Sequence, residues 1–183
     1  MKHLLLAFIA SLLPFGLAAQ DYGALKEADA VGLMRHALAP GTGDPSGFDL
    51  RDCATQRTLD DRGRDQARRT GEAMRAAGLT FDAVWTSQWC RARNTATLLD
   101  VGPVIEVPAL NSHFAGQGDR AGQTREMRKR LAALPVGKRV LLVSHQVNIR
   151  ALAGSSTASG EVIAARRDAD GQLEIIDRYL IAP

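Results

Sequence analysis

Two histidines each follow a short, mostly apolar run in the sequence. His36 comes after residues 30–34 with Arg35 between them, and His145 comes after residues 139–144. A histidine whose first ring nitrogen is held by a backbone carbonyl exposes the other as a neutral nucleophile near pH 7. A second histidine could donate a hydrogen bond to a group that gains negative charge in the transition state. We therefore expect a transfer reaction with His36 as nucleophile and His145 as its electrostatic partner.

Two arginines could bind the group that is transferred. The planar guanidinium holds two phosphoryl oxygens at once and stays protonated, which makes Arg35 and Arg91 the candidates. Ser87 is predicted to cap a helix that reaches about Leu99, so Arg91 would lie in the first turn, where free backbone N–H groups favour an anion. The chemistry expected is phosphoryl transfer through a phosphohistidine that water hydrolyses, with no metal or other cofactor.

These side chains need a sheet that brings distant segments together. Strands are predicted at residues 30–34, 81–86, 104–107, 139–144, 161–165 and 173–177, with helices at 62–77, 88–99, around Met127 and Leu131, and at 146–153. This alternation predicts a three-layer α/β/α sandwich with a mainly parallel central sheet. In such sheets ligands bind beyond the carboxyl ends of the strands. His36, Arg91 and His145 should therefore meet at one edge, beside a long Gly- and Pro-rich loop at residues 39–52.

The amino-terminal segment is typical of a secretory signal peptide. Lys2 precedes an apolar run at residues 4–17, which ends in the small residues Ala18 and Ala19. The run is short for a transmembrane helix, although an uncleaved membrane anchor is the alternative. Cleavage after Ala18 or Ala19 would leave one domain at residues 20–183. We expect a periplasmic or secreted protein with no stable membrane anchor after cleavage of residues 1–19.

Charge and cysteine content narrow the class of partner. The net charge is only +3, and the arginines of residues 62–75 and 120–130 are spaced as on solvated helix faces, although some could rim an anion site. A nucleic-acid partner is not expected. Cys53 and Cys90 are the only cysteines, and export would allow a disulfide between them, although spacing alone does not show that they approach. Without nearby ligands they make a poor zinc site, so no metal is expected.

Four segments, taken in order, resemble the motifs of the histidine phosphatase superfamily, which includes the phosphoglycerate mutases. They are residues 33–36, 59–67, 86–96 and 143–145, and the resemblance covers nearly all of the mature chain. It implies that His36 is the phosphorylated nucleophile and that Arg35, Arg91 and His145 form the phosphate pocket. Residues 37–45, 52–57 and 145–149 resemble exported members that act on lipopolysaccharide core heptose phosphate. The implied partner is a phosphorylated small molecule or an envelope glycan.

The sequence departs from the superfamily pattern where a proton donor is expected. Gln146 replaces the aspartate of the acid phosphatase branch, and residues 110–113 lack the glutamate of mutase-like members. His113 and Glu161 are candidate acids, and Asn148 is a candidate pocket residue, although surface or capping roles are simpler. A missing acid favours a leaving group that departs easily, such as that of a sugar 1-phosphate, a pyrophosphate or a phosphohistidine.

The missing acid also motivates two alternatives. One is a non-catalytic phosphate-binding or sensing module of the same fold. The other is a phosphotransferase that passes the group to an acceptor other than water.

Overall fold

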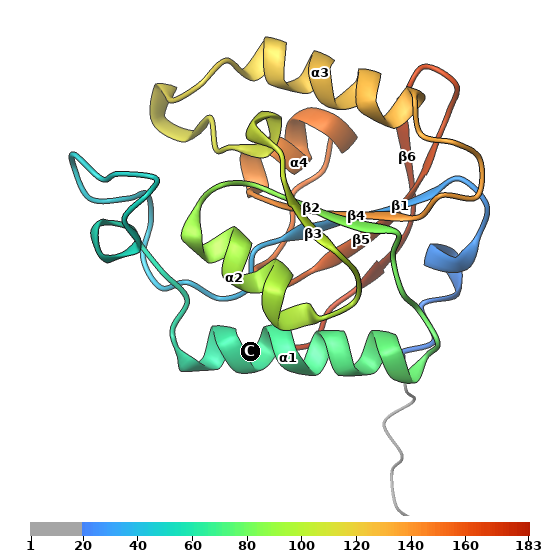
Figure 1. Ribbon diagram of the computed structural model, residues 1–183, viewed down its shortest axis with the longest axis horizontal. Coiled ribbons are helices and arrows are strands. Elements are labelled where there is room, and N and C mark those ends of the chain that lie inside the picture. The colour runs from blue at the N-terminus through green and yellow to red at the C-terminus, as the bar shows by residue number, and fades with distance from the viewer. Residues whose placement is uncertain (1–19) are drawn as a thin grey trace, which may run out of the picture.

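A six-stranded mixed sheet lies between two layers of helices in the computed structural model, which describes residues 20–183 (Figure 1). The strand order is β3-β2-β4-β1-β5-β6; the first four of these strands are parallel, and β5 is antiparallel to both of its neighbours, β1 and β6. This arrangement confirms the predicted three-layer α/β/α fold. The expected signal peptide, residues 1–19, lies outside the described residues. The strands are β1 (Ala30–Arg35), β2 (Ala83–Thr86), β3 (Val104–Glu106), β4 (Val140–Ser144), β5 (Val162–Arg167) and β6 (Leu173–Tyr179).

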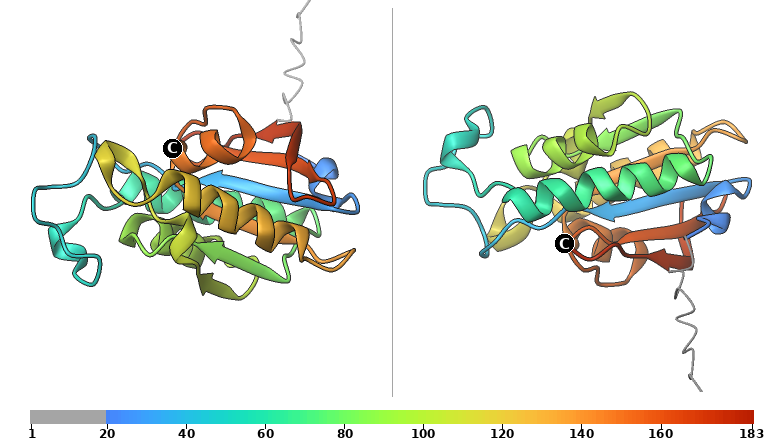
Figure 2. Two further views of the ribbon diagram at one scale, coloured as in Figure 1. Left: turned by 90° about the horizontal axis from the view of Figure 1, so that it is seen from above. Right: turned by 90° about the horizontal axis from the view of Figure 1, so that it is seen from below.

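The helices divide into two pairs, one on each face of the sheet (Figures 1 and 2). One pair, α1 (Asp61–Ala76) and α2 (Cys90–Leu99), buries Met74 and Leu99 in the core on its side. The other pair, α3 (Arg120–Ala132) and α4 (Gln146–Ala153), buries Leu131 and Ile149 on the opposite side. Four short 3₁₀ turns complete the structure: η1 (Gly23–Lys26), η2 (Cys53–Thr55), η3 (Pro108–Leu110) and η4 (Phe114–Gly116). Among the helices of residues 20–183, none is long and apolar enough to cross a membrane.

The two central strands are buried on both faces. Along β4, Leu141 and Val143 pack into the core on the α1 and α2 side, whereas Val140 and Leu142 pack on the α3 and α4 side. A continuous apolar run suits such a strand, because successive side chains point to opposite faces and both must be apolar. This is why the run before each histidine predicted its strand correctly.

Helix α1 begins and ends where the sequence predicts. The Asp60 carboxylate accepts a hydrogen bond from the Gly63 backbone N–H at 2.8 Å, and Gly78 beyond the helix has a φ of +71°. A Cβ on Gly63 would lie 1.9 Å from the Leu38 carbonyl oxygen, so only glycine lets the helix approach that backbone. The chain just after His36 therefore packs directly against α1.

The predicted cap of α2 was wrong. Trp89, not Ser87, occupies the N-cap position, because its carbonyl accepts the first helical hydrogen bonds, from Ala92 and Arg93. The Ser87 hydroxyl instead accepts from the Trp89 backbone N–H at 3.2 Å and contacts His145. Arg91 is nevertheless the second residue of α2 and lies in its first turn, as expected.

Candidate active site

The carboxyl ends of β1, β2 and β4 meet at one end of the sheet, and a pocket of about 260 Å³ lies beyond them. His36 follows β1, His145 follows β4 and Arg91 comes from the first turn of α2, so the structure brings together the three residues expected to converge. Arg35 also lines this pocket. The long loop between β1 and α1 lies beyond the same end of the sheet (Figure 2).

His36 is buried and is held as a neutral imidazole. Its Nδ1 donates to the Ala37 carbonyl at 2.8 Å, and its Nε2 accepts from Arg91 Nε at 3.2 Å. Burial, followed by the nearby charge of Arg91, lowers the pKa of His36 from 6.5 to about 3. The nitrogen that carries the lone pair is therefore Nε2, which faces a guanidinium.

His145 lies beside His36, with 5.5 Å between the ring centroids. Its Nε2 is 2.9 Å from the Ser87 hydroxyl, which donates its own proton to the Asn111 Oδ1 at 3.3 Å. His145 Nε2 is therefore the donor of its pair. Burial, and then the charges of His36 and Arg91, lower the pKa of His145 well below 6.5. Both histidines are thus neutral, and His145 offers one N–H proton.

Asp44 holds the guanidinium of Arg91 and was not predicted from the sequence. Arg91 Nη1 lies 2.7 Å from Asp44 Oδ1, Arg91 Nη2 lies 3.1 Å from Asp44 Oδ2, and both side chains are under 5% exposed. The carboxylate also accepts from Trp89 Nε1 at 3.0 Å. Burial raises the pKa of Asp44, but the hydrogen bond from Arg91 and its charge outweigh this, so the pKa is lowered. Asp44 binds the end of the guanidinium and leaves the Nε edge turned toward His36.

Arg57 is a second pocket residue that the sequence did not predict. Its Nε donates to the Gly43 carbonyl at 2.8 Å, and its Nη1 donates to the Ala39 carbonyl, so it also fixes the loop. Burial, and then the charge of Arg91, lower the pKa of Arg57 to about 10. The only available signal was that the long loop lies beside a predicted site.

The charge of the pocket suits a phosphoryl dianion. Three guanidinium groups, from Arg35, Arg57 and Arg91, line it with the single carboxylate of Asp44, which leaves a balance of +2 when both histidines are neutral. Arg35 Nε is buried and has no hydrogen-bond partner within residues 20–183. An unpaired buried donor is unfavourable unless a ligand completes it. The charge of the pocket and this free donor therefore suit an oxyanion.

Three of the predicted candidates do not reach this pocket. Glu161 pairs with Arg178 at 2.7 Å and accepts from the Ala158 backbone N–H at 2.7 Å, so its carboxylate serves the turn before β5. Asn148 is buried and donates to the Asn111 carbonyl at 2.8 Å. His113 lines a neighbouring hollow instead. Asp44 is thus the only carboxylate among the lining residues, and Arg91 keeps it ionised.

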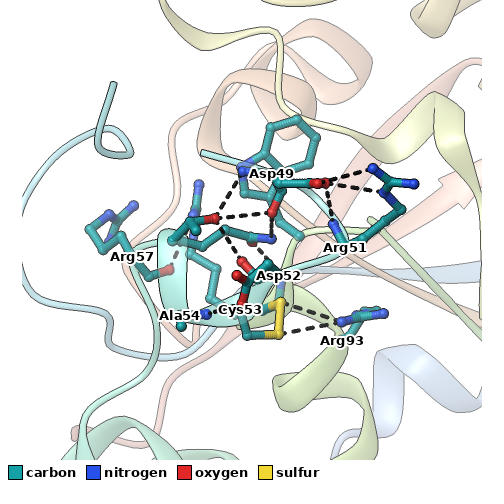
Figure 3. The surroundings of a disulfide bond; sticks show 12 residues. Asp49, Arg51, Asp52, Cys53, Ala54, Arg57 and Arg93 are labelled. Carbon is teal, nitrogen blue, oxygen red and sulfur yellow. Dashed lines mark hydrogen bonds and ion pairs between the residues drawn. A yellow bond between two sulfur atoms is a disulfide. The ribbon is translucent and has the colours of Figure 1, made fainter. Parts of the chain in front are cut away.

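Cys53 and Cys90 form a disulfide with 5.6 Å between their α-carbons, as predicted. It joins η2 in the long loop to the first residue of α2, directly before Arg91. The Arg93 guanidinium faces both sulfur atoms (Figure 3), and the Gln56 side chain accepts from the Cys90 backbone N–H at 2.9 Å. The bridge therefore fastens the loop that carries Asp44 and Arg57 to the helix that carries Arg91.

Removing this disulfide should weaken both stability and anion binding. The double change Cys53→Ser and Cys90→Ser should lower the free energy of unfolding by about 3 kcal/mol, because the bridge closes a long loop. The loosened loop should also weaken tungstate binding, measured by calorimetry at a temperature where the variant remains folded. Unchanged tungstate affinity in the folded variant would contradict the positional role of the bridge.

The low pKa of His36 predicts a loss of stability in mild acid. Between pH 6.5 and about 3 the unfolded chain binds a proton at this position that the folded protein does not, so the free energy of unfolding falls as the pH falls. Urea unfolding at about pH 7 and about pH 5 should show wild type losing about 2 kcal/mol more than His36→Asn. Equal losses in the two proteins would show that His36 protonates normally in the folded state.

Comparison with known proteins agrees with this geometry. The model of the histidine phosphatase superfamily (branch 1) matches residues 33–130, more than half of the chain. The chain belongs to this superfamily, which confirms the resemblance found in its sequence and supports a phosphatase-type enzyme. No curated protein sequence gives a significant match.

Several solved structures share the fold. The protein histidine phosphatase SixA complexed with tungstate is 17% identical, with a TM-score of 0.58 over 82% of this chain and 96% of that chain. A putative phosphohistidine phosphatase SixA from Agrobacterium tumefaciens is 18% identical, with a TM-score of 0.58 over 85% and 97% of the two chains. A phosphoserine phosphatase from Entamoeba histolytica is 13% identical, with a TM-score of 0.60 over 81% and 95%. The closer likeness to heptose phosphate phosphatases stays a prediction.

Proposed function

We propose that this protein is a metal-independent phosphatase that transfers a phosphoryl group to His36 Nε2 and then to water. One observation carries the proposal. His36 is neutral, and its unprotonated Nε2 faces a pocket whose lining side chains have a net charge of +2. Metal ions are not required for the charge stabilisation, because the three guanidinium groups can supply it. Within residues 20–183, no three His, Cys, Asp or Glu side chains gather as a metal-binding group.

The contacts around His36 suggest the order of events. Arg91 Nε donates to the lone pair that must attack phosphorus, so an entering phosphoryl oxygen would take over this N–H and free the nucleophile. Arg35 Nε would donate to a second oxygen, and His145 Nε2 would donate to a third by exchanging the Ser87 hydroxyl for the phosphoryl group. Attack forms the N–P bond and breaks the bond to the leaving oxygen. Water then cleaves the phosphohistidine and restores neutral His36.

Among the described residues that line the pocket, no carboxylic acid is free to protonate the leaving group. Asp44 is ionised and paired with Arg91, and Glu161 lies elsewhere. The leaving group must therefore be weakly basic without a proton from the enzyme, which favours a sugar 1-phosphate, a pyrophosphate or a ring-protonated phosphohistidine over an ordinary alkyl phosphate.

We further propose that the enzyme works outside the cytoplasm, on a sugar phosphate of the cell envelope. The pattern of residues 1–19 and the Cys53–Cys90 disulfide support export. The likeness of residues 37–45 and 52–57 to heptose phosphate phosphatases supports the substrate. Release of phosphate from purified envelope glycan phosphates would test this choice against cytoplasmic sugar phosphates.

Trapping the intermediate tests the mechanism directly. The protein is mixed with a labelled activated aryl phosphate in excess chelator and quenched in alkali, which preserves phosphohistidine, and the label is mapped by mass spectrometry. We expect a labelled peptide that contains His36. Tight tungstate binding with neither label nor turnover would instead establish the phosphate-binding module, for which the contact between Arg91 and His36 is the favouring observation.

A further inference from the structure

A groove continues from the catalytic pocket along α3 and α4. The neighbouring hollow, about 600 Å³, shares Gln117 and Val147 with the pocket, and Arg120 and Arg150 also line it. A further hollow of about 810 Å³ shares Arg120 and runs along α3. These two helices lie on the same face of the sheet (Figure 1). We call this path from Gln117 to Lys129 the basic groove.

The cations of the basic groove have no carboxylate partners. Arg130, which also lies on α3 but outside the groove, pairs with Glu126 at 2.8 Å. None of the groove cations lies within 4.0 Å of a carboxylate in residues 20–183. They are Arg120, Arg125, Arg128, Lys129 and Arg150. Helix faces that only contact solvent usually carry positive and negative side chains interspersed. The unpaired cations on this face instead favour the anion site, which was the alternative in the sequence analysis.

Positive charge is concentrated on this path. The pocket and the groove together are lined by eight arginine or lysine side chains and two carboxylates, Asp44 and Asp170, a balance of +6. The whole chain carries only +3, so the remaining residues are net negative. A field of one sign that ends in a reaction pocket attracts an anion and orients it.

Two side chains place the first anion site beyond the pocket. Arg120 is the first residue of α3 and Arg150 lies in the last turn of α4, and both are exposed in the hollow next to the pocket. Two exposed guanidinium groups without carboxylate partners, lining one hollow, are groups suited to phosphate.

We propose that the substrate carries a second phosphate group, which binds between Arg120 and Arg150 while the first is transferred to His36. The inference rests on the proposed function of the pocket and names the substrate class of that site. For a phosphoanhydride it also accounts for the absent acid, because the leaving phosphate is weakly basic and its charge is stabilised by the groove cations without a proton. When the bond to that group breaks, its oxygen keeps the electron pair, and water later supplies the oxygen and the proton of the released phosphate.

The test compares substrates with and without a second phosphate. The substrates are an aryl phosphate, tripolyphosphate and a hexose bisphosphate. Comparing the last two shows whether the enzyme prefers a phosphoanhydride or a phosphorylated sugar. The groove variant, Arg120→Gln with Arg150→Gln, should retain kcat/KM for the aryl phosphate. For one or both of the others kcat/KM should fall about tenfold or more, mainly through KM. The matched control is Arg62→Gln with Arg68→Gln on α1, which removes the same charge from the opposite face.

A binding measurement separates failure of this inference from failure of the proposed function. Calorimetry with tripolyphosphate and with the hexose bisphosphate uses His36→Ala, with and without the groove changes, so no turnover is needed. We expect either ligand to bind more tightly than orthophosphate, and we expect this difference in affinity to be lost in the groove variant and to shrink as salt is added. This result would support the inference even if no phosphohistidine forms. Equal affinities of the groove variant and its control for both ligands would overturn it, whether or not the aryl phosphate is hydrolysed.

Discussion

Replacing His36 with alanine should lower kcat for an activated aryl phosphate on the order of 10⁴-fold. The reason is geometric, since the unprotonated Nε2 of His36 faces the Arg91 guanidinium in the pocket. The Nε2 of His145 instead carries a proton and contacts Ser87. The measurement is single-turnover release of the aryl alcohol, which reports the first transfer without the hydrolysis step.

Two readouts guard this prediction against a folding artefact. His36→Ala should retain the thermal transition of a folded protein and should still bind tungstate, because the arginines remain in place. Residual turnover within tenfold of wild type, in a variant that is folded, would reject His36 as nucleophile. The phosphotransferase alternative is examined in the wild type, where added sugars would capture the phosphate in place of water.

Arg91→Ala should damage stability and activity together. The change removes the guanidinium from the nucleophile and leaves the Asp44 carboxylate buried without its partner. Breaking a buried pair from one side destabilises by about 3–5 kcal/mol. Loss of a charged donor to the phosphoryl oxygens should lower kcat/KM on the order of 10²-fold to 10³-fold. Urea unfolding and steady-state kinetics measure the two effects separately.

A double variant separates the two roles of Arg91. Adding Asp44→Ala to Arg91→Ala removes the unpaired carboxylate, so most of the lost stability should return while kcat/KM remains low. If stability and activity returned together, Arg91 would be structural and its contact with His36 incidental. If neither returned, the cavity left by the two side chains would dominate over their charge.

The parts of this molecule that the sequence predicts well are those set by local patterns. The apolar runs before His36 and His145 specify strands buried on both faces, and Asp60 and Gly78 mark the ends of a helix. The alternation of strands and helices then predicts a mainly parallel sheet, whereas the order of its strands comes from the structure alone. Because parallel strands align their carboxyl ends, the convergence of the two histidines could be predicted as well.

The remaining site residues depend on contacts that no local pattern specifies. Asp44 and Arg57 lie in a loop whose path is fixed by hydrogen bonds from Arg57 to the Ala39 and Gly43 carbonyls. A disulfide between cysteines that are 37 residues apart in sequence also holds this loop. Glu161 was a candidate acid because the usual acids of the superfamily are missing, yet its side chain turns to Arg178. The direction of a side chain at such a boundary is decided by its tertiary neighbours.

The pocket has two parts of different origin, and the long loop fixed by the Cys53–Cys90 disulfide forms one of them. The floor, with His36 and His145, consists of residues that follow strands of the central sheet. The roof, with Asp44 and Arg57, belongs to the loop, which is linked to α2 through Cys53. Mutations in the roof can reshape what the pocket admits without disturbing the sheet below. Exchange of the other residues of this loop, with Asp44, Cys53 and Arg57 kept, should therefore offer the same reaction to new substrates.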